Sequence, residues 1–272
     1  MTDAYAVIGN PVAHSKSPRI HQAFARQTGQ DLAYEAILAP PGEFAPVTDA
    51  FRSRGGRGVN ITVPFKLDAF RYASSHTARA ARAGAVNTLR FDGREALGDN
   101  TDGAGLVTDL EQNLARTLRG QRVLLMGAGG AARGVLLPIL ERGPAVLVIA
   151  NRTAGRALEL RARFPEFAAL EGCGYDALAG RSFEIVVNAT SASLGDEPVP
   201  LPAGVFAPGA LAYDMMYGEG LTRFLRTARA QGAGQVADGL GMLVEQAAES
   251  FRLWRGVRPD TRPVLEELRR EG

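Results

Sequence analysis

Short apolar runs alternate with longer segments of helical period along most of the chain, and several helical segments end at a glycine. Short runs rich in β-branched side chains are typical of buried strands, whereas longer segments with apolar positions three and four residues apart are typical of amphipathic helices. A regular alternation of the two predicts βαβ units and a mainly parallel sheet. The pattern therefore indicates the α/β fold class.

The first part of the chain contains such apolar runs, each separated from the next by helical segments. We expect strands at residues 4–9, 32–38, 58–63 and 85–91, and helices at residues 17–29, 42–56, 65–73 and 76–84. A further helical segment at residues 104–116 leads through a glycine to a second series of apolar runs. We therefore expect the join between two domains at this segment, before the series that begins at residue 122.

The second series begins with a strand at residues 122–126, a glycine turn and a helix. Further strands are expected at residues 146–152, 183–193 and 210–218, with helices at residues 153–164 and 221–232. Two last helical segments, at residues 242–254 and 262–271, have no later strand in this series to pack against. We therefore expect them to return to the first domain.

Composition excludes several classes of protein. Hydrophobic residues make up 46% and charged residues 22% of the 272 positions, as in a soluble globular chain with a sizeable core. The net charge is only +2 and the arginines are spread along the chain, so a general nucleic-acid-binding role is not indicated. One cysteine, Cys173, and three histidines without ligand spacing predict neither an internal disulfide nor a metal site. The chain has no apolar run of membrane-spanning length and no leader-like start, so we expect a cytoplasmic protein.

The glycine turn after residues 122–126 has the spacing of a dinucleotide site. Gly127, Gly129 and Ala132 stand at G-x-G-x-x-A positions between a strand and a helix. Gly127 allows the tight turn, Gly129 lets the backbone approach a pyrophosphate, and Ala132 permits close packing of the helix on the strand. Because a second strand ends about twenty residues further on, as this fold requires, a glycine turn without a ligand is the less favoured alternative.

The end of that second strand carries Asn151 and Arg152, followed by Thr153 and Arg156, where an NAD-binding chain usually has an acidic residue. A guanidinium matches a 2′-phosphate, so these residues favour NADP(H) over NAD(H). Arg133, in the first turn of the preceding helix, also indicates a nearby phosphate, because the helix dipole there disfavours a cation. The alternative is that Thr153 caps a helix and the arginines are surface residues; for Thr153 both can hold.

Of the 31 basic residues, only Lys16 and Lys66 are lysines. A lysine retained in a chain that otherwise uses arginine indicates a task that a permanently protonated guanidinium cannot perform, such as proton transfer. Lys66 follows a predicted strand, and we expect Pro64 to occupy the first helical position with Lys66 in the first turn. The helix dipole would disfavour the lysine charge there.

Lys16 lies between two serines, Ser15 and Ser17, with Pro18 opening a helix. Two hydroxyls and free N–H groups at a helix start would suit a small carboxylate. The alternatives are that Ser17 is an ordinary N-cap and that Lys16 is a solvated loop residue.

Other polar side chains gather at predicted strand ends, where open sheets bind ligands. Asn60 and Thr62 could offer hydrogen bonds to a hydroxylated ligand, and Asn87 lies at the next strand. Asp102 follows Asn100 and Thr101 in GDNTDG; it could serve the site or simply cap the helix that follows.

The motifs YAVIGNPVAHSKSP, NITVPFK, AGAVNTL, GDNTDG, GAGGAARG, NRT, NATS, YDMMY and ADGLGMLVEQA occur in this order across nearly the whole chain, which resembles the shikimate dehydrogenase family. The resemblance implies NADPH-linked reduction of 3-dehydroshikimate to shikimate, a step of chorismate and aromatic amino-acid biosynthesis. It also implies a substrate-binding and catalytic domain at residues 1–102, a Rossmann-like NADP domain at residues 103–238, and C-terminal helices at residues 239–272 that return to the substrate domain, with a cleft between the domains.

The resemblance also assigns site residues. Lys66 becomes the catalytic lysine, assisted by Asp102 in acid–base chemistry. The implied substrate contacts are Ser15, Ser17, Asn60, Thr62, Asn87, Asp102, Tyr217 and Gln246. The implied NADP(H) contacts are Gly127, Ala128, Gly129, Gly130, Ala131, Asn151, Arg152, Thr153, Arg156, Thr190, Met215, Gly239 and Met242. Ser193 and Arg223 depart from the common family pattern. No metal is implied, and we expect a monomer or homodimer whose partner is the small-molecule substrate rather than a nucleic acid or membrane.

Three other functions remain open at this point. A quinate/shikimate dehydrogenase with relaxed cofactor use is the nearest one, although Asn151 and Arg152 argue against NAD. A non-catalytic NADPH sensor should have lost Lys66 or Asp102, and both are present. A folate-linked methylene dehydrogenase gives no reason for the paired serines around Lys16.

Overall fold

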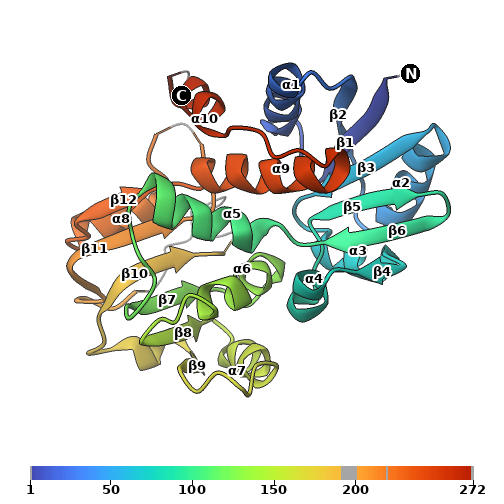
Figure 1. The fold of residues 1–272 in the computed structure, drawn as a ribbon. Helices are drawn as coiled ribbons and strands as arrows, with labels where there is room; N and C mark the ends of the chain where they lie inside the picture. Colours follow the sequence, from blue (N-terminus) through green and yellow to red (C-terminus); the bar gives the residue numbers. More distant parts are fainter. Residues whose placement is uncertain (1, 191–200, 219, 271–272) are drawn as a thin grey trace. The chain divides into compact units, whose positions relative to one another are not determined.

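The computed structural model describes residues 2–190, 201–218 and 220–270, drawn as a ribbon in Figure 1. The chain divides into two compact units. The first unit comprises the residues up to Gly105 together with those from Leu243 onward, and the second unit comprises Leu106–Met242. The chain passes from one unit to the other within α5 (Asp102–Thr108) and again within α9 (Leu240–Arg255). Ser193 lies outside the described residues.

The first unit contains a mixed sheet whose described strands run in the order β2-β1-β3-β5-β6-β4. The strands are β1 (Asp3–Gly9), β2 (Leu32–Leu38), β3 (Gly56–Ile61), β4 (Ser75–His76), β5 (Thr88–Asp92) and β6 (Glu95–Asp99). β1 pairs in parallel with β2 and β3, whereas β5 is antiparallel to β3 and β6. The sequence pattern missed β4 and β6, because β6 is short, partly exposed and paired through a hairpin rather than a helical crossover. It also extended β3 two residues too far.

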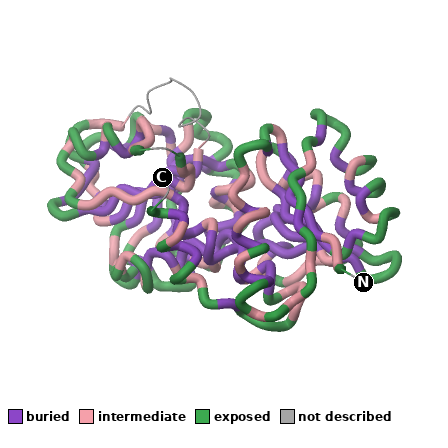
Figure 2. The backbone as a smooth tube through the Cα atoms, turned by 90° about the horizontal axis from the view of Figure 1, so that it is seen from above, coloured by how far each residue is buried: buried purple, intermediate pink, exposed green. Residues whose placement is uncertain are grey.

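Helices cover both faces of this sheet: α1 (Ser17–Thr28), α2 (Phe44–Ser53), α3 (Lys66–Tyr72), α4 (Ala78–Ala83), α10 (Arg262–Arg270) and the part of α9 in this unit. Because side chains alternate along a strand, Ile8 packs with Phe51 in one core, whereas Tyr5 packs with Trp254 in another. Figure 2 shows buried residues along the inner stretches of the backbone and exposed residues on its outer loops.

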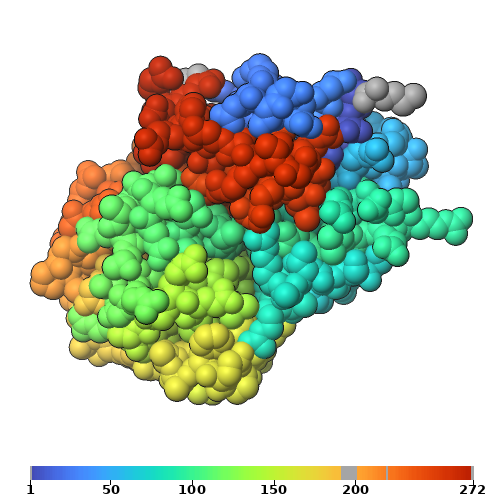
Figure 3. Space-filling view, in the orientation of Figure 1, coloured from blue at the N-terminus to red at the C-terminus, as the bar shows by residue number. Residues whose placement is uncertain are grey.

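The C-terminal helices pack on the N-terminal part of the chain, and the space-filling view shows the red C-terminal segment against the blue N-terminal one (Figure 3). Arg19 of α1 and Glu267 of α10 form an ion pair with an N···O distance of 2.6 Å. Gln27 also donates a hydrogen bond to the backbone of Asp260. These contacts join the C-terminal helices to α1 within the first unit.

The second unit contains a sheet whose described strands are all parallel, in the order β12-β11-β10-β7-β8-β9. The strands are β7 (Arg122–Met126), β8 (Val146–Ala150), β9 (Leu170–Cys173), β10 (Phe183–Asn188), β11 (Phe206–Asp214) and β12 (Gln235–Ala237). In chain order this is the doubly wound arrangement of a Rossmann-like sheet, with its topological switch point between β7 and β10. The strands β9 and β12 escaped prediction, since both are short.

Two cores cover the two faces of the second sheet. Leu125 and Ile149 pack with α6 (Gly130–Leu140) and α7 (Ala154–Ala162) on one face, whereas Met126 and Val148 pack with α8 (Arg223–Ala230) on the other. The prediction of a single helix at residues 104–116 is wrong in its second half, because α5 ends at Thr108.

Beyond α5, Asp109–Asn113 form a π-helical turn, in which the Leu114 N–H bonds to the Asp109 carbonyl. The buried Asp109 carboxylate accepts a hydrogen bond of 2.7 Å from Tyr213. None of the helices in the described ranges is long and apolar enough to cross a membrane.

Candidate active site

An ion pair between a lysine and an aspartate lies at the centre of the first unit's polar groups. The Lys66 Nζ atom is 2.5 Å from Asp102 Oδ2, and the two side chains are only 15% and 6% exposed. In such a position each charge depends on the other for compensation, because little water reaches either. The structure thus brings together the two residues to which the sequence assigned acid–base chemistry.

Each member of the pair is the first residue of a helix. Lys66 begins α3 and Asp102 begins α5. The expectation that Pro64 occupies the first helical position is wrong: Phe65 is the N-cap, and Pro64 lies in the turn before it. Lys66 nevertheless remains in the first turn. Asp102 is not a simple cap, because its carboxylate binds side chains from other segments.

Asn87, just before β5, is the hub of the polar cluster and is only 2% exposed. Its amide nitrogen donates to Asp102 Oδ1 at 2.8 Å and to Gln246 Oε1 at 3.2 Å. Its amide oxygen accepts from the Thr101 backbone N–H at 2.8 Å. Asn100 supports the same turn by accepting from the Asp102 N–H. Asn87 therefore holds the Asp102 carboxylate through the oxygen that Lys66 does not contact.

Asn60, near the end of β3, belongs to the same buried network. Its amide nitrogen donates to Ser250 Oγ at 3.0 Å and to Thr88 Oγ1 at 3.1 Å. Ser250 lies one turn beyond Gln246 on α9 and donates to the Gln246 carbonyl. Strands β3 and β5 and helix α9 therefore hold Asn60, Asn87 and Gln246 within one hydrogen-bonded cluster.

The serines flanking Lys16 lie at the start of α1. Ser17 is the first helical residue and Lys16 takes the cap position, so the alternative that Ser17 is an N-cap is wrong. The Ser15 hydroxyl accepts a hydrogen bond of 3.3 Å from the Ser17 N–H, and Ser17 is buried whereas Lys16 is half-buried. Thr62 follows β3. A Cβ on Gly9 would lie only 2.2 Å from the Thr62 methyl group, so the two segments can approach this closely because residue 9 is glycine.

The glycine turn of the second unit follows β7 at the switch point of the sheet. Gly127 has φ +104°, and a Cβ there would lie 3.1 Å from the Ala189 carbonyl oxygen, so only glycine fits. Gly129 is the N-cap of α6, and a Cβ on it would meet nothing within 4 Å. Ala128 and Gly130 complete the turn and Ala131 follows within α6. No side chain in the described ranges therefore covers the backbone at Gly129, where the first N–H groups of α6 are exposed. Anion binding at a helix start requires such access.

The end of β8 carries the residues expected at the ribose. Asn151 donates from its side chain to the Thr153 carbonyl at 2.9 Å. Arg152, Thr153 and Arg156 are exposed. Thr153 takes the cap position of α7, but its side chain makes no capping hydrogen bond. The half-buried Arg133 of α6 has a buried Nε atom without a hydrogen-bond partner in the described part of the chain.

A second buried network lies where β10 and β11 end. Asn188 donates to Asp214 Oδ1 at 3.1 Å and accepts from the Thr190 hydroxyl at 2.7 Å. Asp214, fully buried, also accepts from the Thr222 hydroxyl at 2.5 Å. This network fixes Thr190 and the chain leading to Met215.

The remaining predicted cofactor residues lie around the same strand end. The Met215 N–H bonds to the Asn188 carbonyl, and a Cβ on Gly239 would lie 2.3 Å from the Met215 oxygen, so the two backbones can approach this closely only through glycine. Met242 is buried in a core of the second unit. Tyr217, predicted to contact substrate, is half-buried in the segment after β11 and belongs to the second unit, unlike the other predicted substrate residues.

Sequence reasoning missed several members of both networks: Tyr34, Thr88, Asp214 and Ser250. Asp214 could have been found, since it stands inside the YDMMY motif. Ser250 could have been found by its position one helical turn after Gln246. Tyr34 and Thr88 carry no local signal, because each has an ordinary place in a strand.

A doubly wound sheet with this glycine turn, in a chain that also holds a buried lysine–aspartate pair, defines the class of dinucleotide-dependent dehydrogenases. The protein named shikimate dehydrogenase (NADP(+)) from Nitrosospira multiformis is 61% identical over 269 residues, which cover 99% of this chain and 98% of that protein. This chain belongs to the shikimate dehydrogenase family.

Family models and solved structures agree with this assignment. Residues 7–89 match the shikimate dehydrogenase substrate binding domain, residues 109–195 match shikimate / quinate 5-dehydrogenase, and residues 239–269 match the shikimate 5′-dehydrogenase C-terminal domain. An Ael1 enzyme from Pseudomonas putida is 54% identical with a TM-score of 0.91, covering 98% of each chain. Shikimate 5-dehydrogenase from Thermus thermophilus, solved with NADP(H) and shikimate, is 36% identical with a TM-score of 0.86, covering 99% of each chain.

Proposed function

We propose that the protein catalyses the NADPH-dependent, reversible reduction of 3-dehydroshikimate to shikimate, a step of chorismate and aromatic amino-acid biosynthesis. The observation that carries the proposal is the buried Lys66–Asp102 pair inside a cluster of amide and hydroxyl groups. A polyhydroxylated ring with one carboxylate needs this combination of hydrogen-bonding groups and a proton donor. The family to which the chain belongs supports the same reaction.

The first unit supplies the substrate contacts in this proposal. Ser15 and Ser17 bind the ring carboxylate at the start of α1. The ring hydroxyls bind Asn60, Thr62, Asn87 and Gln246, with Tyr217 as a further contact from the second unit. Asn60 donates to the Asn87 carbonyl and to Ser250, and Asn87 donates to the Gln246 side chain. These bonds fix the orientations of the three side chains before substrate binds, which lowers the entropic cost of binding.

Lys66 supplies the proton. During reduction, the C3 carbonyl oxygen gains negative charge, and the Lys66 ammonium donates a proton to it to form the hydroxyl of shikimate. In the oxidation direction the neutral amine takes this proton back. Asp102 holds the ammonium at 2.5 Å and orients the reacting hydroxyl, while Asn87 keeps the carboxylate in place from its other oxygen.

The second unit fits NADP(H), which when bound supplies the hydride. The uncovered Gly129 backbone at the start of α6 can accept the pyrophosphate, and Gly127 permits the turn. The described end of β8 presents Arg152 and Arg156 rather than an acid, so a 2′-phosphate is favoured over a free 2′-hydroxyl. The buried, unpartnered Nε of Arg133 is a further donor near the start of α6.

The further cofactor contacts are assigned in the same way. The backbone of Ala128, Gly130 and Ala131 lines the pyrophosphate, and Asn151 and Thr153 line the ribose phosphate. Thr190, Met215, Gly239 and Met242 are assigned to the nicotinamide half, where the Asn188–Asp214 network fixes the strand ends. On this basis the first unit, residues up to Gly105 with those from Leu243 onward, is the substrate domain, and the second unit, Leu106–Met242, is the NADP domain. We also propose that the enzyme works in the cytoplasm. We expect a monomer or a homodimer, and light scattering on the purified protein tests this oligomeric state.

A matrix of two cofactors and two substrates tests the function. Purified protein should reduce NADP⁺ with shikimate, and should react much more slowly with quinate or with NAD⁺. Comparable rates with quinate and NAD⁺ would instead identify a quinate/shikimate dehydrogenase with relaxed cofactor use. Binding of NADPH without turnover of shikimate would identify a non-catalytic NADPH-binding protein and refute the proposal.

A further inference from the structure

Tyr34, in the middle of the edge strand β2, is buried and directs its hydroxyl to the polar cluster of the first unit. The phenol donates a hydrogen bond of 2.7 Å to Asn60 Oδ1. Because an amide group has one acceptor side and one donor side, this bond also fixes the Asn60 nitrogen toward Thr88 and Ser250. Tyr34 therefore helps to fix the orientation of the Asn60 amide.

Tyr34 has one hydroxyl proton, and it goes to Asn60. Burial raises the pKa of Tyr34 well above its usual value, and the Ser17 side chain opposes this rise. The phenol is therefore neutral and can act as a donor. Asn60 lies on β3 and Tyr34 on β2, so the bond fixes a proposed substrate contact from a strand that does not carry it.

His21 holds the Tyr34 ring in place. The two rings are stacked with centroids 4.3 Å apart and an interplanar angle of 5°, and His21 is fully buried one helical turn after Ser17. Neither His21 ring nitrogen has a hydrogen-bond partner within the described ranges, so the contacts recorded for this residue are made through its ring faces and edges. Trp254 of α9 packs on the same pair of rings.

We infer that Tyr34 is a positioning residue for the substrate, whose hydroxyl orients the hydroxyl-binding Asn60 while His21 fixes its ring. This inference rests on the proposed shikimate dehydrogenase function and adds a residue to it. Tyr34 acts through Asn60 and is not itself a catalytic residue.

Steady-state kinetics of Tyr34→Phe tests the inference. The variant keeps the ring and its stacking on His21 but loses the hydroxyl. Loss of one buried hydrogen-bonding group should raise the KM for shikimate about three- to tenfold, with the KM for NADP⁺ and kcat within about twofold of wild type. In an Asn60→Ala background, the same substitution should raise the KM for shikimate further by less than about twofold, because the group it orients is gone.

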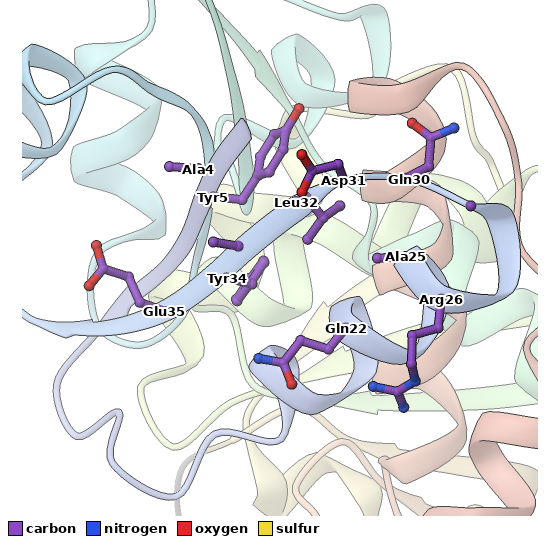
Figure 4. Close-up of a pocket in the computed structure, with 12 residues that line it drawn as sticks. Ala4, Tyr5, Gln22, Ala25, Arg26, Gln30, Asp31, Leu32, Tyr34 and Glu35 are labelled. Carbon is purple, nitrogen blue, oxygen red and sulfur yellow. The ribbon is translucent and has the colours of Figure 1, made fainter. Parts of the chain in front are cut away.

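Tyr5→Phe is the matched control. Tyr5 and Tyr34 lie on neighbouring strands and line the same surface cavity of about 680 Å³ (Figure 4). The Tyr5 hydroxyl accepts a bond from Arg255 and is not part of the proposed site. An unchanged KM for shikimate in Tyr34→Phe, an equal rise in Tyr5→Phe, or a parallel loss of kcat and of NADP⁺ affinity would overturn the inference. An absence of shikimate-dependent turnover in wild type would instead refute the proposed function.

Discussion

The Nζ atom of Lys66 lies 2.5 Å from Oδ2 of Asp102, and each of these residues is the first residue of its helix. A helix start favours a carboxylate and disfavours an ammonium, so α5 stabilises the charge of Asp102 whereas α3 destabilises that of Lys66. The carboxylate compensates for this by direct contact. Lys66 is thus a proton donor in direct contact with the carboxylate that orients it.

Lys66→Arg should abolish most turnover although it retains the positive charge, because a guanidinium does not release a proton at neutral pH. Loss of a positioned acid–base group typically costs about 10²- to 10⁴-fold, so we expect kcat to fall by this amount. The kcat of Lys66→Ala should fall equally, but this variant should still bind shikimate. Calorimetry in the presence of NADP⁺ can measure the binding. Near wild-type kcat in Lys66→Arg would exclude proton transfer by this residue.

Lys16→Ala is the control for the lysine variants. Lys16 is the only other lysine in the chain and takes the cap position of α1, half-buried between the two proposed carboxylate contacts. It can add positive charge near a carboxylate but has no part in proton transfer. Its removal should therefore raise the KM for shikimate severalfold at most and leave kcat within about threefold, which separates charge from chemistry.

Arg152→Ala should weaken the binding of NADP⁺ without affecting the binding of NAD⁺. The exposed guanidinium at the end of β8 is the proposed contact for the 2′-phosphate that distinguishes the two cofactors. A charge-assisted hydrogen bond to a phosphate contributes about 1.5–3 kcal/mol, so the KM for NADP⁺ should rise roughly ten- to a hundredfold. The exposed Arg229 of α8 is the control, and Arg229→Ala should change neither KM. Equal losses with both cofactors would assign Arg152 a role other than phosphate recognition.

Elements that form by local rules could be predicted from the sequence. The glycine turn between β7 and α6 was identified because its spacing, the preceding strand and the following helix all lie within a short segment. The Lys66 position was correct although Pro64 was misplaced, because the helix start depends on a few neighbouring residues. The sequence pattern does not predict the pairing of β5 with β6. The two strands form an antiparallel hairpin, so no helical segment separates them in the sequence as one separates parallel strands.

The hydrogen-bond network of the candidate site could be predicted only in part. Asn87 and Asp102 were selected as polar residues at strand ends, but their bonds to each other and to Gln246 join segments up to 159 positions apart. Tyr34 looks in sequence like any half-buried strand residue, and only its tertiary contact with Asn60 distinguishes it. Long-range pairing determines these roles, and no local pattern records it.

Asp99→Asn should destabilise the protein at neutral pH and have much less effect in acid. Asp99 at the end of β6 accepts two hydrogen bonds from Arg79 and one from Thr77. Burial raises the pKa of Asp99, but the hydrogen bonds and charge of Arg79 lower it more, so the net pKa lies below its usual value of 3.8. The ionised form therefore stabilises the fold above that value, and this contribution disappears as pH falls through the lower folded-state pKa.

Urea unfolding at pH 7 and pH 3 measures this difference. The free energy of unfolding of Asp99→Asn should be lower than wild type by about 2 kcal/mol at pH 7, and the gap should narrow at pH 3. Asp92→Asn is the control, because its side chain is 81% exposed and 3.9 Å from Arg90. A gap that is independent of pH would mean that Asp99 stabilises the fold by packing rather than by its charge.

His21→Phe should make stability less dependent on pH between about 6.5 and 4. Burial lowers the pKa of His21 to about 3. The unfolded chain therefore binds a proton in this window that the folded chain does not, so stability is complete above pH 6.5 and falls as pH decreases.

The loss attributable to His21 approaches about 1.4 kcal/mol per pH unit well below pH 6.5. Carboxylates also titrate below pH 5, so the quantity to measure is the difference in unfolding free energy between wild type and His21→Phe at pH 7, 6, 5 and 4. This difference should shift in favour of the variant as pH falls, because phenylalanine keeps an aromatic ring against Tyr34 but has no site to protonate. His14→Asn, at an exposed position before α1, should follow the wild-type curve. Parallel curves for wild type and His21→Phe would mean that the folded protein admits a proton to His21, and the ring could not then be a permanently neutral support for Tyr34.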